Sequence, residues 1–382
     1  MSFTGKATFT AGAELPEIAE DVSDVIGIVS PYETPLLSEI GDPQREARST
    51  YHEWLEDSLL ANSDVINDQD ITMPGSCPEF DVADISKFRI NDQIQPEGSS
   101  EVMLVIGKTG STLNVTRGYG GTSAEPIEDG QRINIIGPSA VEGEDFPESR
   151  FTARARQGNW TQIFTAGVEV SGSNMAADHI GIAEEMDYQK QMRLRELLRD
   201  LENTVINGAM AQSSPAGTAS QTRTMRGIIR HIQTNIFQAG SGDVPDGDVL
   251  TENMLNWALR QIWEKSCGNV DMIVAGGAQK RRINSFLEGS RWYGPEDTRV
   301  RSGVQMYESD FGVCRVILSR WVPSGTILLL DSSRVSVMPL TGRSMHFKPL
   351  ASSGDYERGE LIGEYTLELK NQQAHGIITG LV

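Results

Sequence analysis

The sequence predicts an α+β protein, and three observations lead to this class. One long segment carries apolar residues at helical spacing, shorter segments alternate apolar and polar residues as strands do, and glycine is abundant. The 382 residues include 38 glycines, about ten per cent of the chain against a usual ~7%. At ordinary domain sizes this length corresponds to about two or three units.

The composition excludes several classes of protein. With 38% hydrophobic and 23% charged residues, the chain can build a sizeable core and is not disordered throughout. No apolar run approaches the ~20 residues that span a bilayer, and Met1–Lys6 does not begin a signal peptide. The net charge of −20 argues against a protein whose main role is to grip the nucleic-acid backbone.

The first half of the chain is predicted to be extended. Residues 1–50 show little periodicity and are expected to form an arm, with a short helix around Ala19–Val29 and an apolar restart at Thr34–Leu37. Such an arm packs either on its own body or on a neighbour. Residues 51–100 carry eleven carboxylates and two cations, a net −9, and their composition favours an extended loop over a helix.

The acidic stretch has two interpretations that the sequence leaves open. It is either a solvated face or a charged arm that meets a basic partner surface. In the second case the candidate interface residues are Glu53, Trp54, Glu56, Asp57, Asp64 and Asp68.

A compact β pattern follows at about 101–137 and predicts a small β insertion in this loop. Val102–Ile106 is expected as a strand, Gly107–Gly110 as a turn and Arg117–Thr122 as a loop. Two further strands are indicated by the alternating pairs Leu113/Val115 and Ile133/Ile135. This piece is too small to be an independent enzyme domain.

The clearest helix is predicted at about 182–207, with a stop at Gly208. Its apolar stripe consists of Met186, Leu194, Leu197, Leu198, Leu201 and Val205. The wet side is expected to carry the ion pairs Arg193–Glu196, Glu196–Arg199 and Arg199–Glu202. A rod of roughly 38 Å with one apolar stripe is typical of a structural strut.

The second half predicts mixed helices and strands. A helix capped by Thr251 precedes a buried strand, and a basic helix follows at Ala278–Leu287. Strands are expected at Val270–Ala275, Val313–Ser319, Ile327–Asp331, Val335–Met338 and Glu360–Lys370. In the last of these, Tyr365, Leu367 and Leu369 are expected on a buried face, and the alternate residues on a wet face.

The main positive area consists of Lys280, Arg281, Arg282 and Arg291, with Arg299 and Arg301 nearby in sequence. Nucleic-acid binding there would be weak because the whole chain is acidic. A salt-bridging surface for another subunit's acidic loop fits the composition better.

Motifs that carry chemistry are incomplete. Gly107-Lys108-Thr109 lacks the first glycine of a phosphate loop, and His52-Glu53 lacks the second histidine of a zincin helix. Asp68 and Asp70 are not followed by the remaining calcium ligands. Cys77, Cys267 and Cys314 are widely spaced and are expected as thiols in a reducing compartment. We therefore predict no catalytic, cofactor or metal site.

Several segments, taken in order, resemble the SU10-like major capsid proteins of tailed bacteriophages, and the resemblance covers most of the chain. The matching segments are Ser23–Ile26, Ser30–Leu37, Ile40-Gly41, His52–Trp54, Asp57–Leu59, Val115–Thr122, Gly158–Phe164, Val168–Gly172, Glu185–Gln189, Glu196–Glu202, Gly363–Asn371 and Ala374–Gly376.

This resemblance implies the HK97-type capsid fold. The implied parts are an N-terminal arm at 1–50, an extended loop at 51–150 with the β insertion, a peripheral domain at 151–222 and 346–382 with the spine helix, and an axial domain at 223–345.

The implied function is a major capsid protein that forms hexamers and pentamers of an icosahedral shell around double-stranded DNA, without sequence-specific contacts. It is not an enzyme and needs no cofactor or membrane. Implied partners are separate scaffolding, portal and decoration proteins, and the chain is made in the bacterial host cytoplasm. The alternatives are an encapsulin-like compartment shell and a hydrolase with a dispersed site. Cross-linking through Lys87 or Lys108 is not expected, because nothing identifies a partner asparagine.

Overall fold

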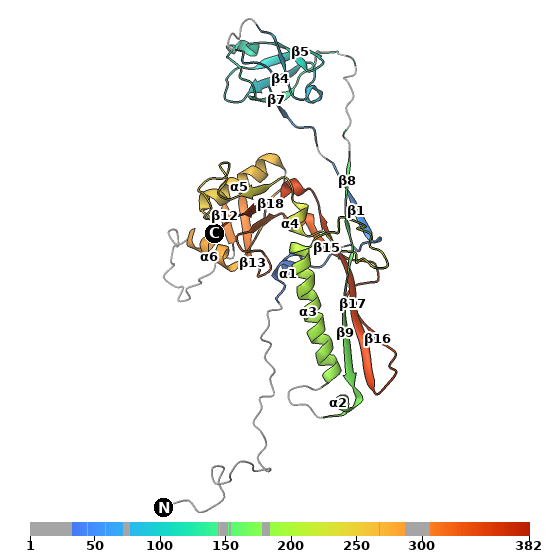
Figure 1. Cartoon of the computed structure of the whole chain (residues 1–382). Helices are drawn as coiled ribbons and strands as arrows, with labels where there is room; N and C mark the ends of the chain where they lie inside the picture. Colours follow the sequence, from blue (N-terminus) through green and yellow to red (C-terminus); the bar gives the residue numbers. More distant parts are fainter. Residues whose placement is uncertain are drawn as a thin grey trace, which may run out of the picture. The chain divides into compact units, whose positions relative to one another are not determined.

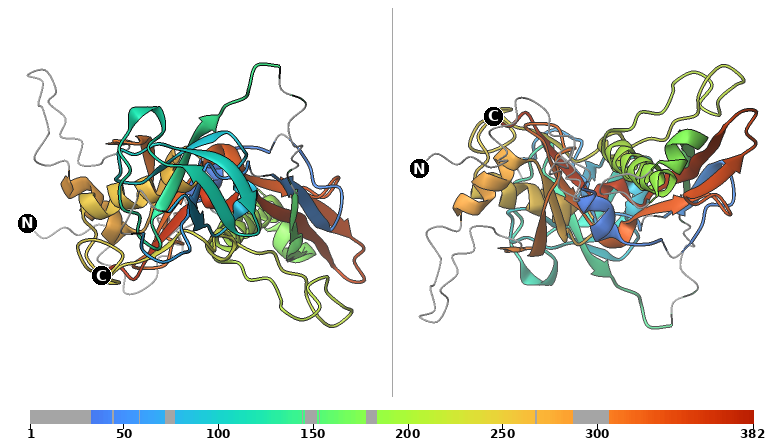
Figure 2. Two further views of the ribbon diagram at one scale, coloured as in Figure 1. Left: turned by 90° about the horizontal axis from the view of Figure 1, so that it is seen from above. Right: turned by 90° about the horizontal axis from the view of Figure 1, so that it is seen from below.

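The computed structural model describes residues 33–43, 45–57, 59–71, 77–143, 145, 152, 154–177, 184–266, 268–286 and 306–382. The chain divides into two units (Figures 1 and 2). Unit 1 comprises Met1–Trp54 and Arg156–Val382, and unit 2 comprises Leu55–Ala155. The helix predicted around Ala19–Val29 lies outside the described residues, whereas the apolar restart at Thr34–Leu37 becomes the short helix α1 (Pro35–Ile40).

Unit 2 is a small β-barrel, and the view from above in Figure 2 looks onto its strands. Its sheet has the order β2-β7-β4-β5-β6-β3. The strands are β2 (Ser63–Val65), β3 (Glu79–Asp81), β4 (Asp92–Pro96), β5 (Met103–Thr109), β6 (Thr112–Thr116) and β7 (Arg132–Pro138). A bridge between Ile66 and Val82 joins the two edges and closes the sheet. Because each strand turns alternate side chains inward, the interior fills with apolar residues such as Phe80, Ile94 and Val105.

The barrel corrects two predictions. The acidic stretch 51–100 contains no α-helix among its described residues, as predicted, but it supplies three of the six barrel strands instead of an irregular loop. The expected turn at Gly107–Gly110 is also wrong, because β5 continues to Thr109 and the reversal falls at Gly110-Ser111. The alternating pairs Leu113/Val115 and Ile133/Ile135 are confirmed as strand residues.

Unit 1 contains a six-stranded sheet of order β10-β18-β14-β11-β13-β12. Its strands are β10 (Ile236–Gln238), β11 (Met272–Ala275), β12 (Met306–Ser309), β13 (Gly312–Leu318), β14 (Ile327–Leu330) and β18 (Gly376–Thr379). Alternate residues of β11 and β14 enter two different hydrophobic cores, one on each face of the sheet. Helix α5 (Glu252–Lys265) packs its Leu255, Leu259 and Ile262 into one of them, and Thr251 caps it as predicted.

A second sheet in unit 1 is organised around one long strand, β17 (Tyr356–Leu369). It pairs with β9 (Gln162–Ser171), β16 (His346–Leu350) and β15 (Val335–Pro339), all antiparallel. The wet face predicted for β17 is wrong, because Glu364, Thr366 and Glu368 are all buried. The two carboxylates can be buried because positively charged partners face them.

The spine helix α3 (Glu185–Asn207) packs against β9 (Figure 1). Most of its stripe is confirmed, since Leu197, Leu201 and Val205 are buried in the core and Leu194 packs at its edge. Met186 is buried in a separate small cluster, whereas Leu198 is only half-buried and lies outside the core clusters. Among the predicted ion pairs, Arg193–Glu196 forms, whereas Arg199 pairs with Asp200 instead. Glu202 was assigned to the wet side wrongly, because it is completely buried.

The remaining described elements are short. They are β1 (Tyr51–Glu56), β8 (Ala155–Trp160), α2 (Gly172–Ala176), α4 (Ile228–His231), α6 (Gly277–Phe286) and the 3-10 turns Ile85–Lys87, Tyr119–Gly121, Ser332–Arg334 and Gln372–Ala374. Gly208 ends α3 as predicted, with its N–H donating to the Thr204 carbonyl.

Candidate assembly surfaces

The two strands that lead into and out of unit 2, β1 and β8, pair with each other. Glu53 lies 3.6 Å from the Arg156 guanidinium, and Asp57 lies 3.8 Å from that of Arg154. The Thr152 hydroxyl also donates to Asp57. Exposed pairs of this kind stabilise by little. They place a cation of the same chain beside two of the acidic-stretch carboxylates.

Two of the six acidic-stretch candidates are interior residues of the chain. Trp54 is 7% exposed and packs near the His231 ring, with centroids 6.0 Å apart. Asp64 is 4% exposed and accepts hydrogen bonds from Lys87 Nζ and from the Asp84 N–H. Their burial within one chain leaves little of either side chain for a neighbour to contact.

The other candidates keep exposed surface. Asp68 accepts from the N–H groups of Gln69 and Asp81, which fixes a turn of the barrel. Glu56 is half-buried, and Glu53 and Asp57 are exposed. These carboxylates stay as interface hypotheses.

Two buried carboxylates fasten β17 to neighbouring elements. Glu364 accepts from the Thr161 hydroxyl and from Arg223, each at 2.5 Å, and pairs with Arg343 at 2.8 Å. Glu368 pairs with His52 of β1 and with Lys370. Burial alone would raise the pKa of Glu368, but the hydrogen bonds from His52 and Lys370 outweigh it and lower that pKa. The sequence separation of these partners hid them from pattern analysis.

The glycine-rich loop of the barrel is held by a third buried carboxylate. Arg117 donates two hydrogen bonds to Glu101, at 2.8 and 2.7 Å, and Glu101 is completely buried. The backbone N–H groups of Gly118 and Glu125 also donate to it. Burial raises the pKa of Glu101, and these hydrogen bonds lower it further than burial raises it. Gly118 has φ of 63°, and a Cβ there would lie 2.7 Å from the Thr122 carbonyl oxygen.

The root of the N-terminal arm is attached to α3 through Glu202. The N–H groups of Leu36 and Leu37 each donate to one of its carboxylate oxygens at 3.3 Å. Burial raises the pKa of Glu202 to about 7, even though these two backbone hydrogen bonds lower it. Glu33 is held separately: Trp321 Nε1 donates to its backbone carbonyl, and Arg320 pairs with its side-chain carboxylate.

The predicted basic helix is present as α6, but its cations differ in environment. Lys280 is half-buried and donates to the Val316 carbonyl at 2.5 Å, and burial lowers the pKa of its amine. Arg281 is exposed and Arg282 is partly exposed. Arg291, Arg299 and Arg301 lie outside the described residues.

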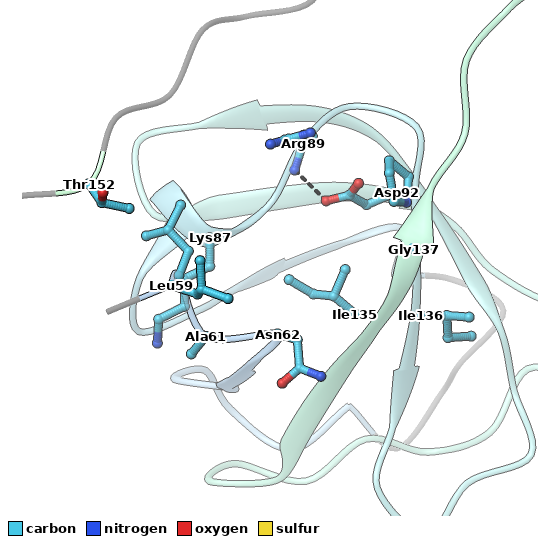
Figure 3. A pocket seen from close by; sticks show the side chains of 12 residues that line it. Leu59, Ala61, Asn62, Lys87, Arg89, Asp92, Ile135, Ile136, Gly137 and Thr152 are labelled. Atoms are coloured by element: carbon cyan, nitrogen blue, oxygen red, sulfur yellow. Dashed lines mark hydrogen bonds between the residues drawn. The ribbon is translucent and has the colours of Figure 1, made fainter. Parts of the chain in front are cut away.

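Unit 2 carries an open hollow that sequence analysis missed (Figure 3). It measures about 720 Å³. The lining residues are Leu59, Leu60, Ala61, Asn62, Lys87, Arg89, Asp92, Ile135, Ile136, Gly137, Pro138 and Thr152. They come from the segment before β2, residues 87–92 around the start of β4, the end of β7, and Thr152, and they come together because β7 lies between β2 and β4 in the sheet.

In the part of the chain that the structure describes, no three His, Cys, Asp or Glu residues are grouped to hold a metal ion. His375 is buried and His231 is partly buried, and desolvation lowers the pKa of each to about 4. Cys314 is buried, and burial raises its pKa to about 11, so its thiol is not a nucleophile at neutral pH. None of the described helices is long and apolar enough to cross a membrane.

A long spine helix beside an elongated sheet, a second sheet with helices, and an inserted β-barrel unit together make up a capsid fold of the HK97 type. Solved structures share this fold. The capsid of a native GTA particle matches with a TM-score of 0.55 and 10% identity, over 100% of both chains. The capsid of Myoviridae Phage XM1 matches with a TM-score of 0.50 and 10% identity, over 97% of this chain and 100% of that one.

The family is shown by the sequence itself. The model of the SU10 major capsid protein family matches residues 2–382, so the chain belongs to this family and is a major capsid protein of a tailed-phage head. The SrpI encapsulin of Synechococcus elongatus PCC 7942 is a more distant match, with a TM-score of 0.44 and 12% identity over 60% of this chain and 78% of that one. No curated protein matches the chain.

Proposed function

We propose that this capsid protein self-assembles into hexamers and pentamers that close an icosahedral head around double-stranded DNA. The observation that carries the proposal is the match of the SU10 major capsid protein family over residues 2–382. The net charge of −20 supports a container that does not hold its genome tightly, since a DNA-gripping surface would be basic.

We assign the parts of the subunit accordingly. Residues 1–50 form the arm, 51–150 the extended loop, 151–222 and 346–382 the peripheral domain, and 223–345 the axial domain. The role is structural and not enzymatic, and it requires no cofactor. Scaffolding, portal and decoration proteins are the expected partners, and synthesis takes place in the bacterial host cytoplasm.

The test is size-exclusion chromatography with light scattering, followed by negative-stain microscopy of every large fraction. Closed shells or rings of the size of a capsomer are expected. A chain that stays monomeric, also when co-expressed with the neighbouring genes of the phage, contradicts the proposal. Turnover in a hydrolase screen that survives particle purification would support the dispersed-site hydrolase instead.

A further inference from the structure

The short helix α1 and its flanking residues are held on unit 1 by side-chain contacts. α1 has six residues, Pro35–Ile40, and is followed by Gly41, which has φ of 75°. A helix of one or two turns has almost no stability of its own. The place of this segment, residues 33–41, therefore depends on what it contacts, and we call it the strap.

The apolar anchor of the strap is small. Leu36 is completely buried and shares a core cluster with Leu201 and Val205 of α3, whereas Leu37 and Ile40 pack only at the edge of that cluster. The other members of the cluster come from the rest of unit 1. The strap can therefore lift while most of the core stays packed.

Two ion pairs hold the ends of the strap. Arg320 pairs with Glu33 at 3.4 Å, and Arg315 pairs with Glu39. Both arginines are exposed. Exposed pairs stabilise by little and weaken in salt. The contact at the middle of the strap therefore carries more weight than its ends.

This middle contact is made by the completely buried carboxylate of Glu202. Its two oxygens accept the N–H groups of Leu36 and Leu37, each at 3.3 Å, and the Ser319 hydroxyl donates from 3.5 Å. In the described part of the chain, no cation pairs with Glu202, and Arg230 and His231 of the neighbouring α4 are not bonded to it. The charged side chains of the strap and of the adjacent turn of α3 bond elsewhere: Glu33 to Arg320, Glu39 to Arg315 and Arg199 to Asp200.

Protonation of Glu202 is linked to the position of the strap. A carboxylate that is buried without a cation pays a large desolvation cost when it ionises. Lifting the strap gives this carboxylate access to water, where it ionises at its ordinary pKa. The seated strap therefore favours the protonated form, and the lifted strap favours the ionised form.

We propose that the strap is a proton-controlled latch that stays on α3 while Glu202 is protonated and lifts more often once Glu202 ionises, while the rest of unit 1 stays folded. The strap belongs to the proposed arm at residues 1–50, so the latch sets how firmly this arm is joined to its own subunit. This inference goes beyond self-assembly, because every group in it belongs to one chain.

Hydrogen exchange of the full-length protein tests the latch. The amides of Leu36 and Leu37 should be protected at least roughly a hundredfold less than those of Leu197 and Leu201, and mild urea should leave their exchange unchanged, because local opening exposes little surface. After correction for intrinsic exchange, their opening should increase roughly tenfold from pH 6 to pH 8.5, since the pKa of Glu202 is about 7 with the strap seated and 4.5 in water. The indole N–H of Trp321, which donates to the Glu33 carbonyl, should follow the same pH dependence.

A matched pair of variants isolates the carboxylate. Glu202→Gln should abolish the pH dependence of strap opening. Glu196→Gln, on the same helix but partly exposed and paired with Arg193, should retain it.

Three results would overturn the inference. They are equal protection of the strap and α3 amides, strap opening that does not change with pH in the parent, and a pH dependence that persists in Glu202→Gln. The first two are measured on the parent, so they decide the question even when the variant does not fold. Particles seen by microscopy together with any of these results would refute the latch and leave the shell function standing.

Discussion

The effect of protonating one buried carboxylate, Glu202, on the stability of the folded subunit can be measured separately. The carboxylate is completely buried between α3 and α1, and burial raises its pKa from 4.5 to about 7. The folded state therefore holds a proton that the unfolded chain releases. This contribution to the free energy of unfolding is fully present below pH 4.5 and is lost as the pH rises through about 7.

The substitution Glu202→Gln removes the titration while keeping the size of the side chain. Between pH 5 and pH 8.5 the two pKa values predict that the variant gains roughly 2–3 kcal/mol of stability relative to the parent. Buried histidines titrate in the opposite direction, so the difference between the two proteins, and not the parent curve alone, isolates Glu202.

The assay is urea unfolding of both proteins at half-unit pH steps, followed by tryptophan fluorescence. Hydrogen exchange at the amides of Leu36 and Leu37 gives a local measurement, since both donate to this carboxylate. A difference in unfolding free energy that stays constant across this pH range would refute the reasoning, because it would mean that Glu202 stays ionised in the fold.

Three further predictions concern other buried groups. Arg117→Ala should lower the stability of unit 2 by about 3–5 kcal/mol, because it leaves Glu101 charged and buried without its main partner. Hydrogen exchange of the unit 2 amides measures this loss, and unchanged protection would contradict the prediction. The parent protein should lose about 3 kcal/mol of stability as pH falls from 6.5 toward 4, because the pKa of His375 in the folded state is about 4. The substitution His375→Asn should remove this loss. Equal urea midpoints of the two proteins at every pH would show that the ring is not buried in its neutral form. Leu201→Asp places a charge in the core of α3, where Leu201 is 3% exposed, and should cost several kcal/mol; an unchanged melting temperature would mean that the stripe is not packed.

Local periodicity predicted those elements whose buried residues recur at a regular spacing in the sequence. The stripe through Leu197, Leu201 and Val205 was found because every member contacts the same core. Glu202 was missed because a carboxylate beside that stripe resembles a solvent-facing residue. Its donors, the N–H groups of Leu36 and Leu37, are 166 and 165 positions away in the chain.

The acidic strands of the barrel were missed for a related reason. β2 and β3 have three residues each, too few to show alternation, and each contributes few apolar side chains to the interior. They become strands because the closed barrel supplies their hydrogen-bonding partners. The hollow lined by Leu59, Arg89 and Ile136 depends on the pairing of β7 with β2 and β4, so no linear pattern could have revealed it.

The position of β18 in the six-stranded sheet has a consequence for the timing of folding. This strand, Gly376–Thr379, comes after all the other strands in the chain, yet it lies between β10 and β14 inside the sheet. The ribosome therefore releases β18, which completes the sheet, after the strands that β18 must join. A chain broken off before Gly376 leaves β10 and β14 without their common partner, and it cannot present the finished surface of a subunit. Because this late strand occupies an inner position of the sheet, only copies whose translation has passed Gly376 can join a growing shell.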